Sequence, residues 1–339
     1  METTKFYLGI DVSKLWFDAS LMLAVDHQRQ PITSQRFIND SEGMKVFKAW
    51  LKSNRVPYDA NTIVVIENTG VYHRLIWSFC SKHNLNLHIG NAAHIKWSLG
   101  ITRGKSDVID SQRLCIYCFK QSEELKVSPT LNPIFMQLKD LMTSRTRLLT
   151  QLQSNKSYLN ELKNSKDKLL FNTLQKVYAT SIDGIKESIF QIEKELMIII
   201  NSDEKIKNNY ELILSIPGIG KITAIYIICC TNNFATKTTG KQLASYAGVV
   251  PFEHSSGTSI KGKNRVHKMA NKELKSLLHL CALSCIRNSE EFKNYYNRKK
   301  EEGKNGMLIL NAIRNKLVLR VVAVIKKQQP YVNNYQKAA

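Results

Sequence analysis

The first 120 residues alternate between two spacings of apolar positions, one typical of strands and one typical of helices. Short apolar runs bounded by polar breaks predict strands, and apolar residues three and four apart predict helices. The predicted strands, in chain order, are 6–10, 15–25, 32–38, 62–66 and 85–89, and the predicted helices are 41–51, 71–83 and 107–120. The basic segment 94–105 shows neither spacing and is predicted to be a loop.

Three strands, a helix, a strand, a helix, a strand and a helix is the element order of an RNase H-like α/β domain, which we place at residues 1–125. In that arrangement the first and fourth strands lie side by side, so residues at their carboxyl ends meet. Asp11 follows the first strand and Glu67 follows the fourth. Either acid alone is typical of an ordinary turn after a strand, but the pair at one sheet edge indicates a site.

Asp107 and Asp110 lie one turn apart at the start of the predicted helix 107–120 and therefore share a face. Like charges at this spacing repel, so a fold selected for stability alone avoids them unless a cation lies between them. For this pair alone, the simpler interpretation is an acidic first turn that complements the helix dipole. With Asp11 and Glu67 at the same edge, four carboxylates converge, and such a cluster predicts hard divalent cations, Mg²⁺ or Mn²⁺.

The middle of the chain, residues 126–205, carries a heptad pattern that predicts a long helical coiled-coil hairpin. Its first apolar stripe consists of Leu138, Leu141, Leu148, Leu152, Leu159 and Leu162, interrupted by Arg145 and Asn155. Its second stripe consists of Ile182, Ile185, Ile189, Ile192, Leu196 and Ile199. Two interpretations remain open. The stripes pack within one chain as a scaffold, or they join subunits, with polar residues such as Asn155 setting the register.

Residues 206–330 are predicted to form a mainly helical domain, which ends in a flexible tail at 331–339. Helical spacing of apolar residues covers 272–287 and again 307–327, with a charged segment between them.

A glycine-rich turn lies near the start of this domain. Pro217 is followed by Gly218, Ile219, Gly220 and Lys221, which resembles the turn of a helix-hairpin-helix. Backbone N–H groups exposed at such a helix start suit a phosphate, and Lys221 adds a positive charge beside them. The alternative is a glycine that ends one helix before another begins.

Net charge narrows the choice of partner. Forty-nine Lys and Arg residues against 28 Asp and Glu give a formal net charge of +21, which indicates a polyanion such as nucleic acid. An anionic membrane is the rival partner, but no apolar run approaches the roughly 20 residues of a spanning helix. Because residues 1–5 also lack the form of a signal peptide, we expect a cytoplasmic protein. Seven scattered cysteines favour reduced thiols in the core over a disulfide framework.

Three motifs around the four acids resemble those of a known family. They are Gly9-Ile-Asp11-Val-Ser-Lys14, Glu67-Asn-Thr-Gly-Val-Tyr72 and Lys105-Ser-Asp107-Val-Ile-Asp110-Ser111. This set is similar to the DEDD transposases of the insertion sequence 110 family and the related pilin-gene invertases. The resemblance implies a RuvC-like metal site formed by the four acids. Ser106 and Ser111 stand where the family more often has Thr and Ala.

The resemblance extends to the C-terminal domain. There the family carries Pro-x-x-x-Ser-Gly, then Lys-x-Gly-Asn and a helix, and its serine before glycine is the nucleophile. Ser256 matches that serine, although one extra residue separates it from Pro251, so Ser255 and then Ser259 are further candidates. On the sequence alone, this Ser-Ser-Gly is an ordinary turn.

The second half of the motif departs from the family at two positions. It reads Lys268-Met-Ala270-Asn271, with Ala270 in place of Gly, and Lys275 stands where Arg is usual. The residues that we expect to contact nucleic acid are Lys105, Gly218, Gly220, Lys221, Lys261, Lys263, Arg265 and Lys268.

The family resemblance implies a DNA recombinase that forms a covalent link between Ser256 and DNA. It also implies guidance by a structured bridge RNA, donor and target DNA as substrates, and a dimer or tetramer. Two other classes remain open: a RuvC-like nuclease that uses water in place of Ser256, and a nucleic-acid binder without catalysis. The Gly-Ile-Asp-Val-Ser opening also resembles actin-like ATPases, but no glycine-rich phosphate loop follows.

Overall fold

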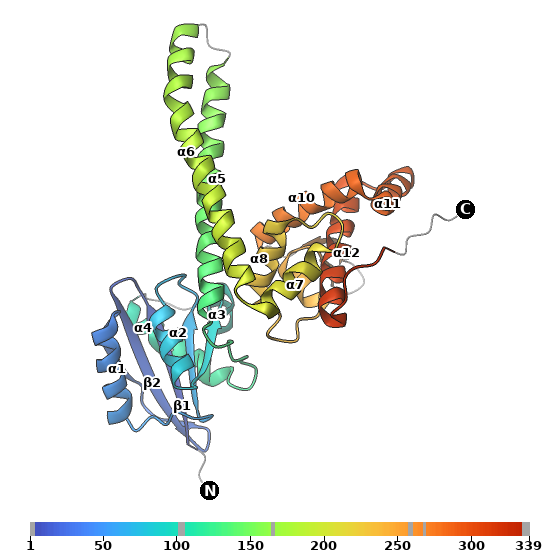
Figure 1. Cartoon of the computed structure of the whole chain (residues 1–339). Helices are drawn as coiled ribbons and strands as arrows, with labels where there is room; N and C mark the ends of the chain where they lie inside the picture. Colours follow the sequence, from blue (N-terminus) through green and yellow to red (C-terminus); the bar gives the residue numbers. More distant parts are fainter. Residues whose placement is uncertain (1–3, 101–105, 164–166, 257–259, 267–268, 334–339) are drawn as a thin grey trace. The chain divides into compact units, whose positions relative to one another are not determined.

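The computed structural model describes residues 4–100, 106–163, 167–256, 260–266 and 269–333, with the backbone alone for 253–256 and 260–265. The chain forms two compact units, Met1–Asn132 and Pro133–Ala339 (Figure 1). Within the described ranges, no helix combines the length and the apolar character needed to cross a membrane.

A mixed β-sheet forms the centre of the first unit. Its strands are β1 (Thr4–Val12), β2 (Trp16–Val25), β3 (Gln28–Arg29), β4 (Thr33–Ile38), β5 (Thr62–Glu67) and β6 (Asn86–Gly90). The order is β3-β2-β1-β5-β6, with β4 also paired to β2. β1 is antiparallel to β2 and parallel to β5, so the predicted neighbourhood of the first and fourth apolar runs is confirmed.

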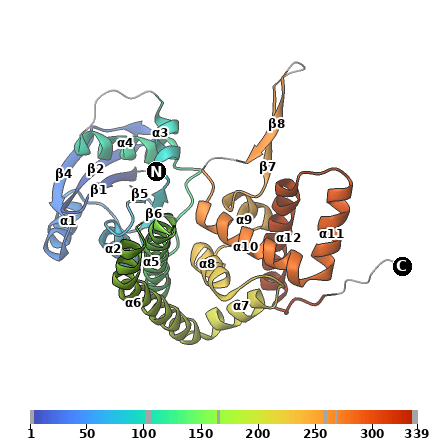
Figure 2. The ribbon, with the colours of Figure 1, turned by 90° about the horizontal axis from the view of Figure 1, so that it is seen from above.

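Helices cover both faces of this sheet. α1 (Ser41–Ser53) and α2 (Arg74–Lys82) lie on one face, and α4 (Asp107–Lys120) lies on the other (Figure 2). Side chains alternate accordingly along β1: Leu8 packs in the core under α1 and α2, whereas Tyr7 packs with α4. The helix predicted at 107–120 is confirmed over its full length. Ser106 caps its start by accepting a hydrogen bond from the Ile109 N–H.

The predicted loop at 94–105 is wrong in its first half. Residues Ala92–Leu99 form a helix, α3, whose N-cap Asn91 accepts a hydrogen bond of 2.9 Å from the Ala93 N–H. Ile95 is 2% exposed and Leu99 is partly buried, and both pack against the α4 core. Two apolar positions four apart were too few to stand out among basic residues. The remainder of that segment, residues 101–105, lies outside the described residues.

The second unit is mostly helical. Its helices are α5 (Pro133–Leu162), α6 (Lys168–Asn201), α7 (Glu204–Leu214), α8 (Lys221–Thr231), α9 (Gly240–Tyr246), α10 (Lys272–Asn288), α11 (Glu290–Glu301) and α12 (Gly306–Lys327). One two-stranded hairpin, β7 (Pro251–Ser256) with β8 (Ile260–Val266), joins α9 to α10. α5 and α6 lie side by side as a long hairpin (Figure 1).

Part of the predicted apolar stripes is buried within the second unit. Ile185 and Leu196 of α6 are buried, as is Leu138 of α5. Arg145, which interrupts the first stripe, is paired with Glu193 of α6 at 2.7 Å, so a charge pair bridges the two helices at that level. The intrachain scaffold is therefore one use of these stripes.

The cysteines lie in the cores as reduced thiols. All seven cysteines are free thiols, and burial raises the pKa of the Cys115 and Cys230 thiols to about 12.

At the start of the C-terminal tail, the Tyr331 N–H donates to Ser215 Oγ at 2.7 Å, and the Arg320 guanidinium lies 4.7 Å from the Tyr331 ring. Residues 334–339 lie outside the described residues.

Candidate functional site

Asp11 and Glu67 lie side by side at the carboxyl ends of two parallel strands. Ile10 of β1 is in register with Ile66 of β5, and each acid is the next residue along its strand. Because side chains alternate, Asp11 is on the same face as Tyr7 and Gly9, which is the face that α4 covers. Val65 packs in that same α4 core, which places Glu67 on this face as well.

A close approach of α4 to β1 brings the other two acids to the same place. A Cβ atom on Gly9 would lie 2.1 Å from the Cys115 backbone nitrogen, so only glycine lets the helix lie this close. Along the same contact, Cys115 Sγ lies 3.0 Å from the Tyr7 carbonyl oxygen, whereas Ser111 lies nearer the end of β1. α4 therefore runs antiparallel to β1, and its first turn, with Asp107 and Asp110, lies at the acidic edge.

Serine hydroxyls attach the first turns of α4 to the sheet. Ser111 is fully buried, and its Oγ is 2.7 Å from Ser20 Oγ of β2, which in turn is 2.8 Å from Ser34 Oγ of β4. Ser111 also donates to the Val108 carbonyl oxygen at 2.8 Å. An alanine at this position would leave Ser20 with Ser34 alone, so this chain has an additional contact between helix and sheet.

The pKa shifts of Asp11 and Glu67 reflect the other acids near them. Burial, the largest cause, and the negative charges of Glu67, Asp107, Asp110 and Asp18 together raise the pKa of Asp11 to about 6. Burial and the charge of Asp110 also raise the pKa of Glu67. A carboxyl whose ionisation is opposed by four other acids has the environment that a bound cation would relieve.

Two of the acids are paired with arginines in this structure. Asp107 contacts Arg36 at 3.0 Å, and Asp110 contacts Arg113 at 2.8 Å. Among the described residues, no three Asp, Glu, His or Cys side chains stand at metal-binding spacing. The chemistry of the donors nevertheless fits a hard divalent ion, since all four are carboxylates and positive groups of the chain already occupy part of the site.

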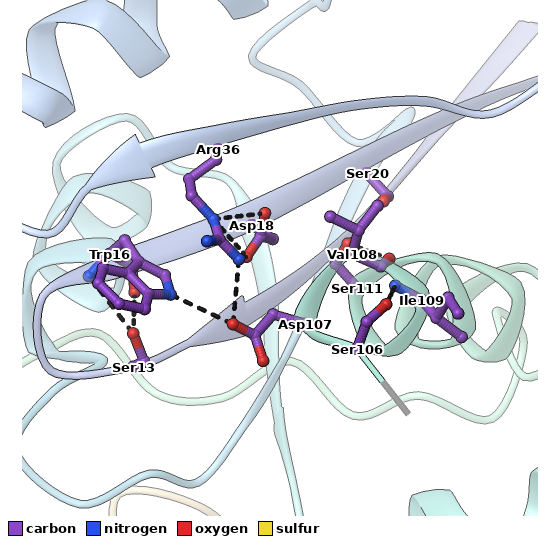
Figure 3. A network of polar contacts seen from close by, with 10 residues as sticks. All are labelled: Ser13, Trp16, Asp18, Ser20, Arg36, Ser106, Asp107, Val108, Ile109 and Ser111. Atoms are coloured by element: carbon purple, nitrogen blue, oxygen red, sulfur yellow. Dashed lines mark hydrogen bonds and ion pairs between the residues drawn. The ribbon is translucent and has the colours of Figure 1, made fainter. Parts of the chain in front are cut away.

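A polar network that the sequence analysis missed surrounds Asp107 (Figure 3). Asp18 of β2 is the cross-strand neighbour of Asp11 on one side and of Arg36 on the other. Asp18 is 1% exposed, and Arg36 donates to both of its oxygens, at 3.1 Å and 2.8 Å. The Trp16 indole N–H donates to Asp107 Oδ2 at 3.2 Å. The tight turn between β1 and β2 was the one signal in the sequence, because it places positions 11 and 18 opposite each other.

The two glycines of the glycine-rich turn have different surroundings: Gly218 is packed against another helix, and Gly220 is open. Gly218 has φ +84°, and a Cβ there would lie 2.2 Å from Cys285 Sγ, so packing against α10 requires this glycine. Gly220 is the N-cap of α8 with no neighbour within 4 Å of an added Cβ and no side-chain cap. Lys221 is exposed beside it. The predicted phosphate contact stays a prediction.

The structure places the backbone of the serine motif on β7 and β8. Ser256 is the last residue of β7 and pairs with Ile260, and Ser255 pairs with Lys261. Lys263 and Arg265 are further residues of β8. The remaining predicted positions, Ser259 and Lys268 here and Lys105 in the first unit, lie outside the described residues.

Asn271, the last residue of the second motif, joins three elements. It caps α10 by accepting from the Leu274 N–H at 2.8 Å, accepts from the Tyr226 hydroxyl of α8 at 3.1 Å, and donates to the Tyr246 hydroxyl of α9 at 2.8 Å. Ala270 beside it replaces the usual glycine, and a Cβ on Gly248 would lie 2.3 Å from the Ala270 Cβ. The alanine is therefore accommodated because position 248 has no side chain.

Known proteins match both units. Residues 8–163 match a DEDD transposase model of the IS110 group, and residues 210–297 match the model of the transposase IS116/IS110/IS902 family. Pilin gene-inverting proteins of Moraxella bovis and Moraxella lacunata are each 28% identical over 338 residues, covering 97% of this chain and 98% of theirs. A 43.6 kDa protein of insertion element IS110 from Streptomyces coelicolor is 34% identical over 93 residues, 27% of this chain and 23% of that protein. The four acids lie in the first matched region, and Ser256 lies in the second.

Proposed function

Because the chain belongs to the IS110 family of DNA transposases and recombinases, we propose that its four acids and Ser256 act together in cutting and rejoining DNA strands. The convergence of Asp11, Glu67, Asp107 and Asp110 at one edge of the sheet is the observation that carries this proposal. The strand order supports a RuvC-like fold for this part of the chain. As functional limits we propose a catalytic domain at 1–125, a hairpin at 126–205 and a serine domain at 206–330.

The four carboxylates would hold divalent cations, Mg²⁺ or Mn²⁺. When bound, such ions neutralise the charge that develops on a phosphate undergoing transfer. The chain's own contribution is rigidity. Asp11 and Glu67 are fixed on paired strands, and the Gly9 contact fixes the helix that carries Asp107 and Asp110. In the loaded state, Asp110 would exchange part of its contact with Arg113 for the cation.

Ser256 would be the nucleophile. Its Oγ forms a bond to the phosphorus of the scissile phosphodiester, and the bond from that phosphorus to a deoxyribose oxygen breaks. The hydroxyl proton leaves the serine, and the released deoxyribose oxygen takes up a proton. One phosphate ester replaces another, so the strand can later be rejoined to a different partner by the reverse reaction.

Basic side chains and the backbone of the glycine-rich turn would hold nucleic acid through its phosphates. The residues that we propose for this role are Lys105, Gly218, Gly220, Lys221, Lys261, Lys263, Arg265 and Lys268. Contacts of this kind are independent of sequence and weaken steeply with salt. Selection of the donor and target DNA is therefore assigned to a structured bridge RNA, and the net charge of +21 suits a protein that holds RNA and two duplexes.

We expect strand exchange to require the RNA. Purified protein with Mg²⁺, donor and target duplexes, and RNA transcribed from the segment that flanks its gene should give joined products on denaturing gels. The same mixture without RNA, or with an unrelated RNA of equal length, should not. Cut ends that are never joined would favour the water-using nuclease, and binding without any cut in Mg²⁺ or Mn²⁺ would favour the non-catalytic binder.

We also propose that the hairpin joins two or more copies of this chain. α6 leaves Val177 and Phe190 exposed, at 64% and 60%, although Ile185 and Leu196 of its predicted stripe are buried. Light scattering of the wild type should show a dimer or tetramer, and Val177→Lys with Phe190→Lys should give a smaller species. Leu280→Lys is the matched control, because Leu280 is 62% exposed on α10 of the same unit. A wild type that stays monomeric with nucleic acid bound would contradict the proposal.

A further inference from the structure

We infer that Trp16, Asp18 and Arg36 form a clamp that positions Asp107 for the cation. The inference rests on the proposed metal centre and extends it to three residues outside the four acids. The clamp consists of these three side chains alone. Trp16 and Asp18 come from β2, and Arg36 comes from β4.

The clamp holds one oxygen of Asp107 and leaves the other accessible. Oδ2 accepts from Arg36 Nη2 at 3.0 Å and from the Trp16 indole N–H at 3.2 Å (Figure 3). Among the described residues, no hydrogen bond reaches Oδ1. Two donors on a single oxygen fix the rotation of the carboxylate, so Oδ1 is available as a cation ligand in a defined orientation.

Arg36 is itself held by Asp18 and by the ring of Trp16. Its Nε and Nη2 donate to the buried carboxylate of Asp18, a fork geometry that a planar guanidinium suits. Its Cζ lies 5.0 Å from the centre of the Trp16 ring, within the range of a cation–π contact. Neutralising Asp18 does not by itself require a contact between the Arg36 guanidinium and the Trp16 ring. The indole both supports the guanidinium and donates its own N–H to Asp107.

The location of the clamp explains why the site needs it. Asp107 is the first residue of α4, and helix ends are where local opening begins. The Gly9 contact fixes the helix further along, whereas the clamp ties its first residue directly to the sheet that carries Asp11. Partners that orient a metal ligand in this way typically change metal affinity 10-fold to 100-fold when they are removed.

The sharpest test is Trp16→Phe, which keeps a ring under Arg36 and removes only the N–H donated to Asp107. The affinity for Mn²⁺, measured by calorimetry, should fall by about tenfold. Arg36→Gln should weaken the affinity for Mn²⁺ at least as much. Arg36→Lys should keep only part of the affinity, because an ammonium cannot hold both carboxylates as the guanidinium fork does. Trp77→Phe is the matched control, since it removes an indole hydrogen bond of 3.0 Å to the Pro129 carbonyl oxygen.

A purely structural role is distinguished by the melting temperature of the metal-free protein. If the clamp only supports the fold, Trp16→Phe and Arg36→Gln lower that temperature while the Mn²⁺ affinity remains that of the wild type, and the inference is wrong. If both variants bind Mn²⁺ more tightly, Arg36 competes with the cation and the inference is also wrong. If the Asp11→Asn variant still bound Mn²⁺ as the wild type does, the metal centre itself would be refuted. That failure is distinct from a failure of the clamp.

Discussion

Replacing Asp11 by Asn is expected to abolish strand cleavage while making the metal-free protein more stable. The two effects have opposite signs because one carboxylate serves catalysis at a cost to the fold. Burial and four neighbouring acids raise the pKa of Asp11 to about 6 in the folded chain, against roughly 3.9 in an unfolded one. Above pH 6 the group is ionised in both states, and the folded state carries the unfavourable charge.

The pH dependence follows from the direction of this shift. Between about pH 4 and pH 6 the folded protein binds more protons at Asp11 than the unfolded chain does, so stability falls as the pH rises through that window. Asp11→Asn should therefore raise the free energy of unfolding at pH 7.5 by about 1–2 kcal/mol, a figure reduced for solvent screening at this partly exposed carboxyl. The difference between wild type and variant should vanish below about pH 4.

Thermal unfolding in a metal chelator at pH 4 and at pH 7.5 measures this difference. Asp183→Asn is the control, because Asp183 is an exposed helix residue whose replacement should change stability by less than about 0.5 kcal/mol. In the presence of Mg²⁺, Asp11→Asn should cut DNA at least roughly a thousandfold more slowly, the scale of losing charge stabilisation at a transferring phosphate. Cleavage at the wild-type rate by this variant would remove Asp11 from the site.

Much of the acidic edge could be predicted from the sequence because it depends on local rules. The apolar runs that precede Asp11 in β1 and Glu67 in β5 are short, and strand alternation then sets the face that each acid occupies. The helix that begins at Asp107 has a serine cap and apolar residues at helical spacing. Each of these features depends only on a few residues that are neighbours in the sequence, so no tertiary information was needed to predict it.

The clamp could not be predicted, because it depends on how two strands, β2 and β4, meet the helix α4. Asp18, Arg36 and Trp16 are ordinary residues on exposed-looking strand ends, and only the register of β2 against β4 brings the first two together. The β7–β8 hairpin was missed for a related reason. Its strands are rich in polar residues and lack clear alternation, so the turn signal at Ser255, Ser256 and Gly257 dominated the sequence.

Ser256→Ala is expected to abolish a covalent protein–DNA adduct while leaving the binding of RNA and DNA intact. A nucleophilic serine stays attached to the strand that it has cut, whereas a water-using nuclease leaves no such link. Binding should survive, because one hydroxyl contributes about 1 kcal/mol to a large charged interface. A substrate that is nicked beside the scissile phosphate traps the adduct, since the released fragment diffuses away before the strand can be rejoined.

Denaturing gels of labelled DNA then show the adduct, and peptide mapping identifies the attached serine. Ser255→Ala is the matched control, because Ser255 and Ser256 are successive residues of β7 with backbone partners Lys261 and Ile260. The wild type and Ser255→Ala should both form the adduct, and Asp11→Asn should form none. An adduct that persists in Ser256→Ala and disappears in Ser255→Ala would move the nucleophile by one residue. Cleavage by the wild type with no adduct under any of these conditions would mean that water, and not a serine, attacks the phosphate.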